Sequence, residues 1–350
     1  MPDPLAAPST DPTPIFEIFR GNYGTELLTA AIAHFDLFGR LADVPRHEDD
    51  LRGELSLAPR PATVLFTALR AFGLVRNGAD GRLELTTLAR EHLAPGGEFD
   101  VSAYVGLAAD SPGVLAMVER LRANRPPGTR EDEEGTAFIY RRGVRSAMDR
   151  EETARHLTMS LAGRGKNVAP VLAQRLPLEG ATHLLDVGGG SGIYAIAWLR
   201  RHPHLRATVW DRAEVLKVAA EMAATYGVAD RLQCVAGDMF ADPVPGDTDV
   251  VLLSNVLHDW DVPDCRRLIA RLAEALPSDG RLLIHDVFLN DALDGPLPIA
   301  LYSAALFSLT EGRAYSAAEY RGWLLEAGLT PRPIVPTLIH CGVLEGTVRF

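Results

Sequence analysis

The sequence predicts a two-domain α/β protein, whose second half is a doubly wound parallel sheet and whose first half is mostly helical. Three observations support this prediction. Residues 183–187 are a short apolar run that leads into three glycines at alternating positions, Gly188, Gly190 and Gly192. Apolar residues at helical spacing follow in residues 193–201, and strand-like and helix-like segments alternate after them. Since buried parallel strands are apolar throughout, this alternation indicates a sheet covered by helices on both faces.

Length and charge narrow the functional classes. The chain has 350 residues and a hydrophobic fraction of 47%, which suits two domains with real cores. Its formal net charge of -11 and pI near 5.4 disfavour a nucleic-acid or anionic-membrane partner, because those surfaces attract Lys and Arg. Cys234, Cys265 and Cys341 are far apart and lack C-x-x-C spacing, so neither a disulfide framework nor a thiolate zinc site is indicated.

The N-terminal part reads as a tail followed by a helical domain. Residues 1–14 are rich in Pro, Asp, Ser and Thr and lack the apolar core of a signal peptide, so we expect a disordered tail and a cytoplasmic protein. Residues 15–100 have the pattern of a winged helix, in which a helix-turn-helix pair precedes a hairpin. The segments expected in order are a helix over residues 15–33, a helix pair over 48–57 and 59–72, and strands over 74–76 and 83–85.

A winged helix ordinarily suggests DNA binding, and the charge pattern argues against it here. The second helix of the pair, residues 59–72, has only Arg60 and Arg70 as basic side chains and is otherwise mostly apolar. A helix that enters the major groove needs more positive charge, whereas an apolar helix suits burial against another subunit. We therefore expect a homodimer formed through this domain, with no nucleic-acid partner.

Acidic residues stand at the C-terminal ends of the predicted strands. Asp186 lies near the end of the first strand, and a second strand over residues 207–210 ends in Asp211, about twenty residues past the glycines. At that spacing an acidic side chain accepts hydrogen bonds from both hydroxyls of a ribose, which leaves a nicotinamide dinucleotide possible. Later landmarks argue against that cofactor: a third strand leads into residues 235–240, and a fourth runs into residues 254–260.

Three segments in this order resemble the motifs of class I S-adenosylmethionine-dependent methyltransferases. They are residues 185–192 (LDVGGGSG), 237–240 (GDMF) and 257–260 (LHDW), with weaker support from residues 311–316 (EGRAYS). More narrowly, the chain resembles the small-molecule O-methyltransferases that have an N-terminal winged-helix dimerisation domain and occur in plant phenolic pathways and bacterial secondary metabolism. The resemblance covers nearly the whole chain. It implies a Rossmann-like methyltransferase domain over residues 171–350, S-adenosyl-L-methionine as cofactor, a small-molecule acceptor and a homodimer.

The resemblance assigns a part of the cofactor to each strand end. Asp186 and the glycine loop would hold its amino-acid part, and Asp211 its ribose. Asp238 would bind the adenine amino group, with Met239 packed on the ring. The alternative for Asp238 is a loop cap, and we favour the cofactor role because this residue lies just past the third strand, at the edge where ligands bind. The candidate cofactor-binding residues are Asp186, Gly188, Gly190, Gly192, Asp211, Asp238, Met239 and Ser254.

His258 is the candidate general base. It follows the fourth predicted strand, residues 249–253, and is expected at the same rim as the methyl group of the cofactor. Imidazole can remove a proton near neutral pH, and methyl transfer from a sulfonium needs little beyond a deprotonated acceptor held in line. By the resemblance, Asp286 at the end of the fifth strand, residues 281–287, orients the histidine, and Glu311 approximately matches a second catalytic carboxylate.

The acceptor site is assigned by the same resemblance. Residues 101–170 would form a helical connection that supplies the floor of the acceptor pocket and much of the dimer interface. Arg164, which lies between two glycines, has the charge to pair with an acceptor carboxylate, although a surface turn is the favoured interpretation of that segment. The candidate substrate-binding residues are Phe138, Met148, Met159, Arg164, Trp260 and Arg313.

Two further hypotheses stay open. His258, His285 and Asp286 are metal-ligand types, so a divalent metal would assist C-methylation of a 2-oxo acid, with Arg164 or Arg313 pairing with its carboxylate. O-methylation is favoured because the histidines lack a compact spacing and acid–base pairs use the same residue types. Period-two alternation also turns His285 and Asp286 to opposite faces of their strand unless its end is twisted. The other hypothesis is a dimeric regulator that binds the cofactor without turnover.

Overall fold

The structure, a computed structural model, describes residues 2–125 and 150–348 and divides into two compact units. Of the described residues, the first unit, here called the sheet unit, comprises 2–16, 150–288 and 317–348. The second, the helical unit, comprises 17–125 and 289–316. The predicted α/β fold class, with a mostly helical N-terminal region, is confirmed.

The sheet unit contains a mixed sheet whose central strands are parallel. In the described residues it has eight strands, in the order β5-β4-β3-β6-β7-β10-β8, with β9 paired to β10. The strand β3 lies between β4 and β6 and is parallel to both, whereas β10 is antiparallel to β7. The strands are β3 (His183–Val187), β4 (Arg206–Asp211), β5 (Leu232–Ala236), β6 (Val250–Ser254), β7 (Arg281–Val287), β8 (Leu329–Pro331), β9 (Val335–Pro336) and β10 (Cys341–Val348).

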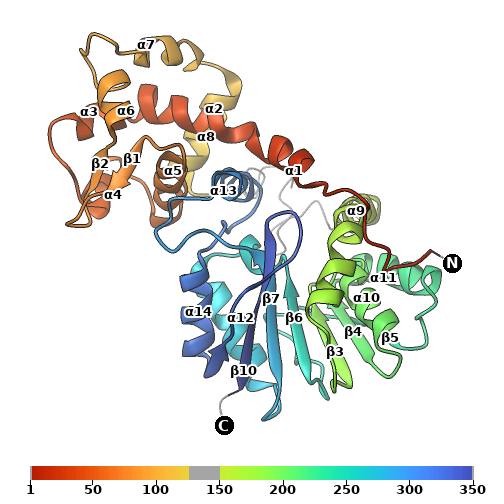
Figure 1. The fold of residues 1–350 in the computed structure, drawn as a ribbon. Coiled ribbons are helices and arrows are strands. Elements are labelled where there is room, and N and C mark those ends of the chain that lie inside the picture. The colour runs from red at the N-terminus through yellow and green to blue at the C-terminus, as the bar shows by residue number, and fades with distance from the viewer. Residues whose placement is uncertain (1, 126–149, 349–350) are drawn as a thin grey trace. The chain divides into compact units, whose positions relative to one another are not determined.

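Helices cover both faces of this sheet, with α9, α10 and α11 on one side and α12 and α14 on the other (Figure 1). Burial on both faces explains why β3 and β6 are apolar along most of their length. Large buried side chains such as Trp198 and Leu216 fill the space between α10, α11 and the strands. The helical elements are α9 (Glu151–Arg175), α10 (Ile193–Arg201), α11 (Ala213–Thr225), η5 (Leu257–Asp259), α12 (Val262–Glu274) and α14 (Ala317–Glu326).

The helical unit contains the predicted helix pair and hairpin. Val75 pairs with Leu85 across the antiparallel hairpin, and the first strand is displaced by one residue from the prediction. The predicted helix over residues 15–33 is divided into consecutive α, 3-10 and π segments. The elements are α1 (Thr13–Arg20), η1 (Gly21–Tyr23), α2 (Gly24–Thr29), η2 (Ala30–His34), α3 (Leu37–Ala42), α4 (Glu48–Glu54), α5 (Pro59–Ala71), β1 (Val75–Asn77), β2 (Leu83–Leu85), α6 (Thr87–His92), α7 (Ser102–Val105), η3 (Gly106–Ala108), α8 (Pro112–Ala123) and α13 (Leu297–Leu309).

Both arginines of α5 are buried inside the helical unit. The Arg60 guanidinium donates from Nη1 to the carbonyl oxygens of Thr310 (3.0 Å) and Gly312 (3.2 Å). The Arg70 side chain donates from Nε to Asn77 Oδ1 at 2.9 Å and forms an ion pair with Glu48. The two basic residues of this helix therefore hold neighbouring segments of their own unit together.

The units differ from the predicted continuous domains in two places. Residues 289–316 return to the helical unit, because α13 packs against α5. Residues 2–16 belong to the sheet unit, where Leu5 and Phe16 pack against the core and Ile339 donates its N–H to Thr13 Oγ1 at 3.2 Å. The disordered tail predicted for residues 1–14 stays a prediction, although these apolar anchors argue against it. Within the described residues, no helix is both long and apolar enough to cross a membrane.

Candidate functional site

The glycine loop after β3 has a left-handed backbone at each of its three alternating glycines. Gly188, Gly190 and Gly192 have φ angles of 62°, 59° and 68°, in the left-handed region that favours glycine. A Cβ on Gly190 would meet no protein atom within 4 Å, so the loop faces open space there. Gly189, which the alternating pattern did not single out, is also required, because its Cβ would lie 2.5 Å from Asp186 Cγ.

Asp186 is a buried carboxylate beneath this loop. Among the described residues, neither of its oxygens has a hydrogen-bond partner, although the side chain is fully buried. Burial, together with the nearby Asp211 carboxylate, raises the pKa of Asp186 to about 8. A buried acceptor without a donor is costly, and the ammonium of a bound amino acid would satisfy it. The loop and the carboxylate thus fit the amino-acid part of the expected cofactor.

Asp211, at the end of β4, contacts the same loop. Its Oδ2 accepts the N–H of Gly190 at 2.8 Å and its Oδ1 accepts the N–H of Arg212 at 2.7 Å. Burial raises the pKa of Asp211, and these two hydrogen bonds oppose that rise. The carboxylate is therefore fixed beside Gly190, where it can meet a ribose that follows the amino-acid part.

The other candidate cofactor residues lie at the same end of the parallel strands. Asp238 and Met239 follow β5, and Asp238 Oδ1 accepts the N–H of Phe240 at 2.8 Å. Asp238 therefore acts as a loop cap, which leaves its binding of adenine a prediction. Ser254 is the last residue of β6, and its Oγ lies 2.9 Å from His285 Nδ1, so it belongs to a buried polar network.

His258 and Asp286 form a buried pair at this rim. His258 lies on η5, directly after β6, and Asp286 lies near the end of the neighbouring strand β7. The distance from His258 Nδ1 to Asp286 Oδ1 is 2.6 Å, and both side chains are almost inaccessible to solvent. Since an ionised carboxylate only accepts, Nδ1 is the protonated nitrogen and Nε2 is left as the basic one. Asp259 Oδ1 lies 3.7 Å from that Nε2.

The electrostatics of the pair favour a charged imidazolium. Burial lowers the pKa of His258, but the carboxylates of Asp286 and Asp259 outweigh burial and raise it above its ordinary value. Burial raises the pKa of Asp286, but His258 and the hydrogen bond between them hold it below its ordinary value. Partial burial also raises the pKa of Asp259, whose side chain is 38% exposed, to about 6. An imidazole between two carboxylates is well suited to take up a proton.

His285 points away from this pair. Its Nδ1 lies 2.9 Å from Ser254 Oγ and its Nε2 lies 3.0 Å from Thr337 Oγ1. Burial lowers the pKa of His285 to about 3, with Arg164 adding to the effect. His285 and Asp286 occupy opposite faces of β7, as the alternation predicts, and both His285 nitrogens lie at hydrogen-bond distance from hydroxyl groups. The ligand set of His258, His285 and Asp286 is therefore not brought together, and no cluster of three potential metal ligands occurs in the described parts of the chain.

Comparison with known proteins identifies the family. The family model of the O-methyltransferase domain matches residues 130–330, more than half of the chain. The chain is 36% identical over 319 residues to the 3-hydroxy-5-methyl-1-naphthoate 3-O-methyltransferase of Streptomyces sahachiroi, covering 91% of this chain and 89% of that one. The chain belongs to the O-methyltransferase family. The cofactor of this family is S-adenosyl-L-methionine.

Solved structures agree with this assignment. An O-methyltransferase family 2 protein from Planctomyces limnophilus, crystallised in complex with apigenin, is 49% identical with a TM-score of 0.90, covering 100% of this chain and 99% of that one. Human N-acetylserotonin methyltransferase in complex with S-adenosylmethionine has the same fold at 20% identity, with a TM-score of 0.60 and coverage of 99% and 100%. These comparisons favour O-methylation over metal-assisted C-methylation and over a regulator without turnover.

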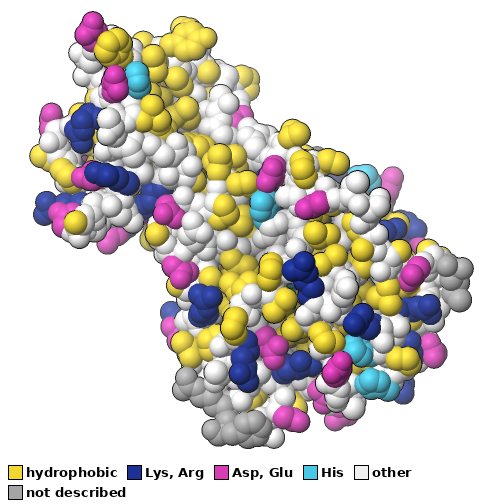
Figure 2. All heavy atoms as spheres, in the orientation of Figure 1, with side chains coloured by type: hydrophobic (Ala, Val, Ile, Leu, Met, Phe, Trp, Pro, Cys, Tyr) yellow, Lys and Arg dark blue, Asp and Glu magenta, His cyan; other side chains and the backbone are white. Residues whose placement is uncertain are grey.

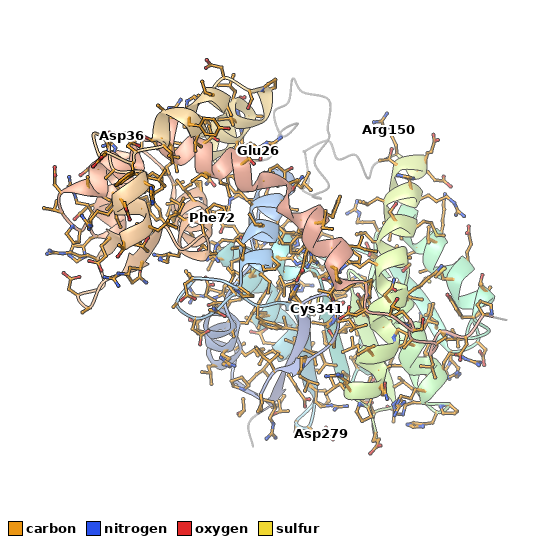
Figure 3. All side chains as sticks on the ribbon, turned by 45° about the horizontal axis from the view of Figure 1, so that its top comes forward. Glu26, Asp36, Phe72, Arg150, Asp279 and Cys341 are labelled. Atoms are coloured by element: carbon orange, nitrogen blue, oxygen red, sulfur yellow. The ribbon has the colours of Figure 1, made fainter. Side chains whose placement is uncertain are left out.

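In this O-methyltransferase, Arg164 does not lie on a surface turn. The segment around it is the middle of α9, and Gly165 serves helix packing, because its Cβ would lie 2.6 Å from Ile193 Cγ2. The Arg164 guanidinium donates to Asn255 Oδ1 and to Cys341 Sγ, both at 2.9 Å. Cys341, labelled in Figure 3, is the first residue of β10. The surface-turn interpretation was wrong because it assigned to chain reversal a glycine that allows close helix contact.

The remaining acceptor candidates and the candidate catalytic carboxylate Glu311 lie on several elements of the two units. Trp260 is buried and its ring meets that of Phe240 edge to face, with centroids 4.7 Å apart. Met159 is exposed on α9. Glu311 and Arg313 belong to the helical unit, where Arg313 Nη1 donates to the Ala314 carbonyl at 2.9 Å. Their roles stay predictions. Phe138 and Met148 lie outside the described residues.

Tyr320 contacts the pair and was not predicted from the sequence. This residue lies on α14 of the methyltransferase, and its hydroxyl donates to Asp286 Oδ2 at 3.2 Å. A tyrosine in a helix-like segment is ordinarily core, and nothing in its spacing from His258 or Asp286 marks it as part of the pair. Only the packing of α14 against the sheet brings it there.

Proposed function

We propose that this enzyme methylates a hydroxyl oxygen of a flat aromatic small molecule, with His258 as the general base. The observation that carries the proposal is the buried pair of His258 Nδ1 and Asp286 Oδ1, 2.6 Å apart. The acceptor class follows the relatives, since one is named for a hydroxynaphthoate and another was crystallised with apigenin. A bacterial secondary-metabolite phenol fits both.

The bound cofactor supplies an electrophilic methyl group, so the protein has to position the acceptor and remove its proton. His258 Nε2 takes the hydroxyl proton as the oxygen becomes nucleophilic. Asp286, at Nδ1, keeps the ring in the required tautomer and stabilises the imidazolium that forms. The amino-acid part of the cofactor is proposed to bind to Asp186 and the glycine loop, and its ribose to Asp211. Its adenine is proposed to bind to Asp238 and Met239.

Turnover on matched acceptors tests this function. S-adenosylhomocysteine formation is measured with bicyclic and tricyclic phenols, and each phenol is paired with its own methyl ether, in which the reacting oxygen is already blocked. Product with the phenols and none with the ethers supports O-methylation. Product with 2-oxo acids alone, lost on chelation and restored by a divalent ion, would overturn it in favour of carbon methylation.

The pH dependence of the reaction is predicted from the raised pKa of His258. The base works only when neutral, so kcat/KM is expected to be low in acid and to rise with pH through an ionisation above 6.5, the ordinary histidine value. Removing a carboxylate neighbour in Asp286→Asn should move this ionisation to lower pH, together with a lower plateau. If the ionisation instead tracks the phenol pKa across a series of acceptors, the titrating group is the substrate and not His258.

A homodimer formed through the helical unit is the proposed assembly. Ile18, Phe19, Tyr104 and Leu107 of this unit are each at least 74% exposed, which is unusual for large apolar side chains. Light scattering should report about twice the chain mass of 37.9 kDa. Leu107→Asp should weaken the dimer, whereas Leu325→Asp, at an exposed position of α14 in the sheet unit, should not. A monomer at micromolar concentration would contradict the proposal.

The proposal also includes a cytoplasmic location, and it includes no nucleic-acid partner. The absence of a nucleic-acid partner is supported by the burial of Arg60 and Arg70 of α5 and by the mixing of basic and acidic side chains over the face drawn in Figure 2. The net charge of -11 also disfavours binding to nucleic acid, because the phosphate backbone is negatively charged.

A further inference from the structure

We propose that Tyr320 is a positioning residue for the general base, because its hydroxyl fixes the second carboxylate oxygen of Asp286. The proposal rests on the proposed role of His258, and it adds a third side chain to the pair. The resulting chain of contacts runs from Tyr320 through Asp286 to His258 Nδ1.

The Asp286 carboxylate accepts hydrogen bonds on both of its oxygens. Oδ1 accepts two donors, His258 Nδ1 at 2.6 Å and the N–H of Val287 at 2.8 Å. Oδ2 accepts the Tyr320 hydroxyl at 3.2 Å. Rotation of the carboxylate about the bond between Cβ and Cγ would move Oδ1 away from both of its donors and would break the Tyr320 contact to Oδ2 at the same time. The Tyr320 hydroxyl therefore adds a third restraint on the carboxylate plane, and with it on the direction in which Oδ1 meets the imidazole.

The Tyr320 hydroxyl is itself held rigidly. Tyr320 is fully buried on α14. Its ring is packed edge to face between Phe288 and Trp323, with centroid distances of 5.4 Å and 5.3 Å. Contacts on two sides restrict the ring, so the donor is in place before any substrate binds. A donor ordered in advance costs no rearrangement during proton transfer.

Asp286 and Tyr320 lie close to the points where the chain leaves the sheet unit and returns to it. Asp286 and Phe288 are near the end of β7, where the chain passes into the segment 289–316 of the helical unit. Tyr320 is in the first turn of α14, directly after the chain returns. The Tyr320 hydrogen bond and ring contact therefore join the outgoing and the returning ends within the sheet unit. This explains why a residue distant in sequence is placed so firmly against the base pair.

Tyr320→Phe tests the proposal, because it removes one hydroxyl and keeps the ring. Losing a hydrogen bond to a charged group should lower kcat by roughly three- to thirtyfold with KM for the cofactor unchanged. The proton on His258 Nδ1 should give a far-downfield NMR signal that shifts in this variant. Tyr226→Phe, which removes the hydroxyl of another buried tyrosine of the sheet unit, is the matched control and should leave both quantities unchanged.

A double-mutant cycle separates action through Asp286 from a general packing effect. In an Asp286→Asn background, Tyr320→Phe should change kcat by less than about twofold, because the group through which it acts has been altered. An equal loss in both backgrounds, or an unchanged kcat and NMR signal in Tyr320→Phe, would overturn the proposal. His258→Ala tests the role of the general base separately. Full activity in that variant would refute the role of His258. An inactive His258→Ala variant together with a fully active Tyr320→Phe variant would refute the role of Tyr320 alone.

Discussion

Replacing His258 with alanine is expected to lower kcat by roughly a hundredfold to ten-thousandfold, with cofactor affinity near that of the wild type. The imidazole is the basic group at the rim, held by Asp286 at 2.6 Å, and its loss leaves the acceptor proton to water. The cofactor is expected to contact the glycine loop and Asp211 instead, so binding should survive. Steady-state kinetics and calorimetry with S-adenosylmethionine measure the two quantities.

His204→Ala is the matched control for this variant. His204 is an exposed histidine in the loop before β4 and belongs to the same unit. It should leave kcat and affinity unchanged. An active His258→Ala enzyme would remove the general base from the mechanism, and a variant that no longer binds cofactor would place His258 in the binding site.

Gly190→Val is expected to weaken cofactor binding by at least about a hundredfold while the protein stays folded. The glycine has a φ of 59°, which a β-branched residue adopts only with strain, and its missing Cβ faces open space. Valine side-chain atoms would fill that space beside Asp186 and Asp211, where the amino-acid part and the ribose are proposed to lie. Calorimetric titration with S-adenosylmethionine tests the effect, and a thermal melt without ligand reports the fold.

Gly180→Val separates ligand exclusion from backbone strain. Gly180 also has a positive φ, 80°, and also has no atom within 4 Å of its Cβ position, but it lies in the turn before β3, away from the glycine loop. Both variants should lose similar stability, and only Gly190→Val should lose cofactor binding. Normal affinity in Gly190→Val would overturn the assigned cofactor loop.

The sequence alone determined the local features of the sheet unit. The bounds of β3 and β7 were predicted to the residue, because buried strands and helices differ in the spacing of their apolar residues. The glycine-rich turn after β3 was predicted from the alternating Gly188, Gly190 and Gly192, whereas their left-handed φ angles were seen only in the structure. The opposite orientation of His285 and Asp286 followed from the two-residue period of a strand.

Contacts between distant segments were decided by the tertiary structure. His258 and Asp286 are 28 residues apart, and Tyr320 is a further 34 residues away from Asp286, so their contact depends on β6 and β7 being neighbours and on where α14 packs. Arg164 was taken for a surface residue because flanking glycines suggest a turn, whereas the close approach of α9 to α10 requires one of them. Periodicity reports which face of its own element a residue occupies. The partner opposite that face depends on how the elements pack, and here packing alone brought Tyr320 to the base pair and returned residues 289–316 to the helical unit.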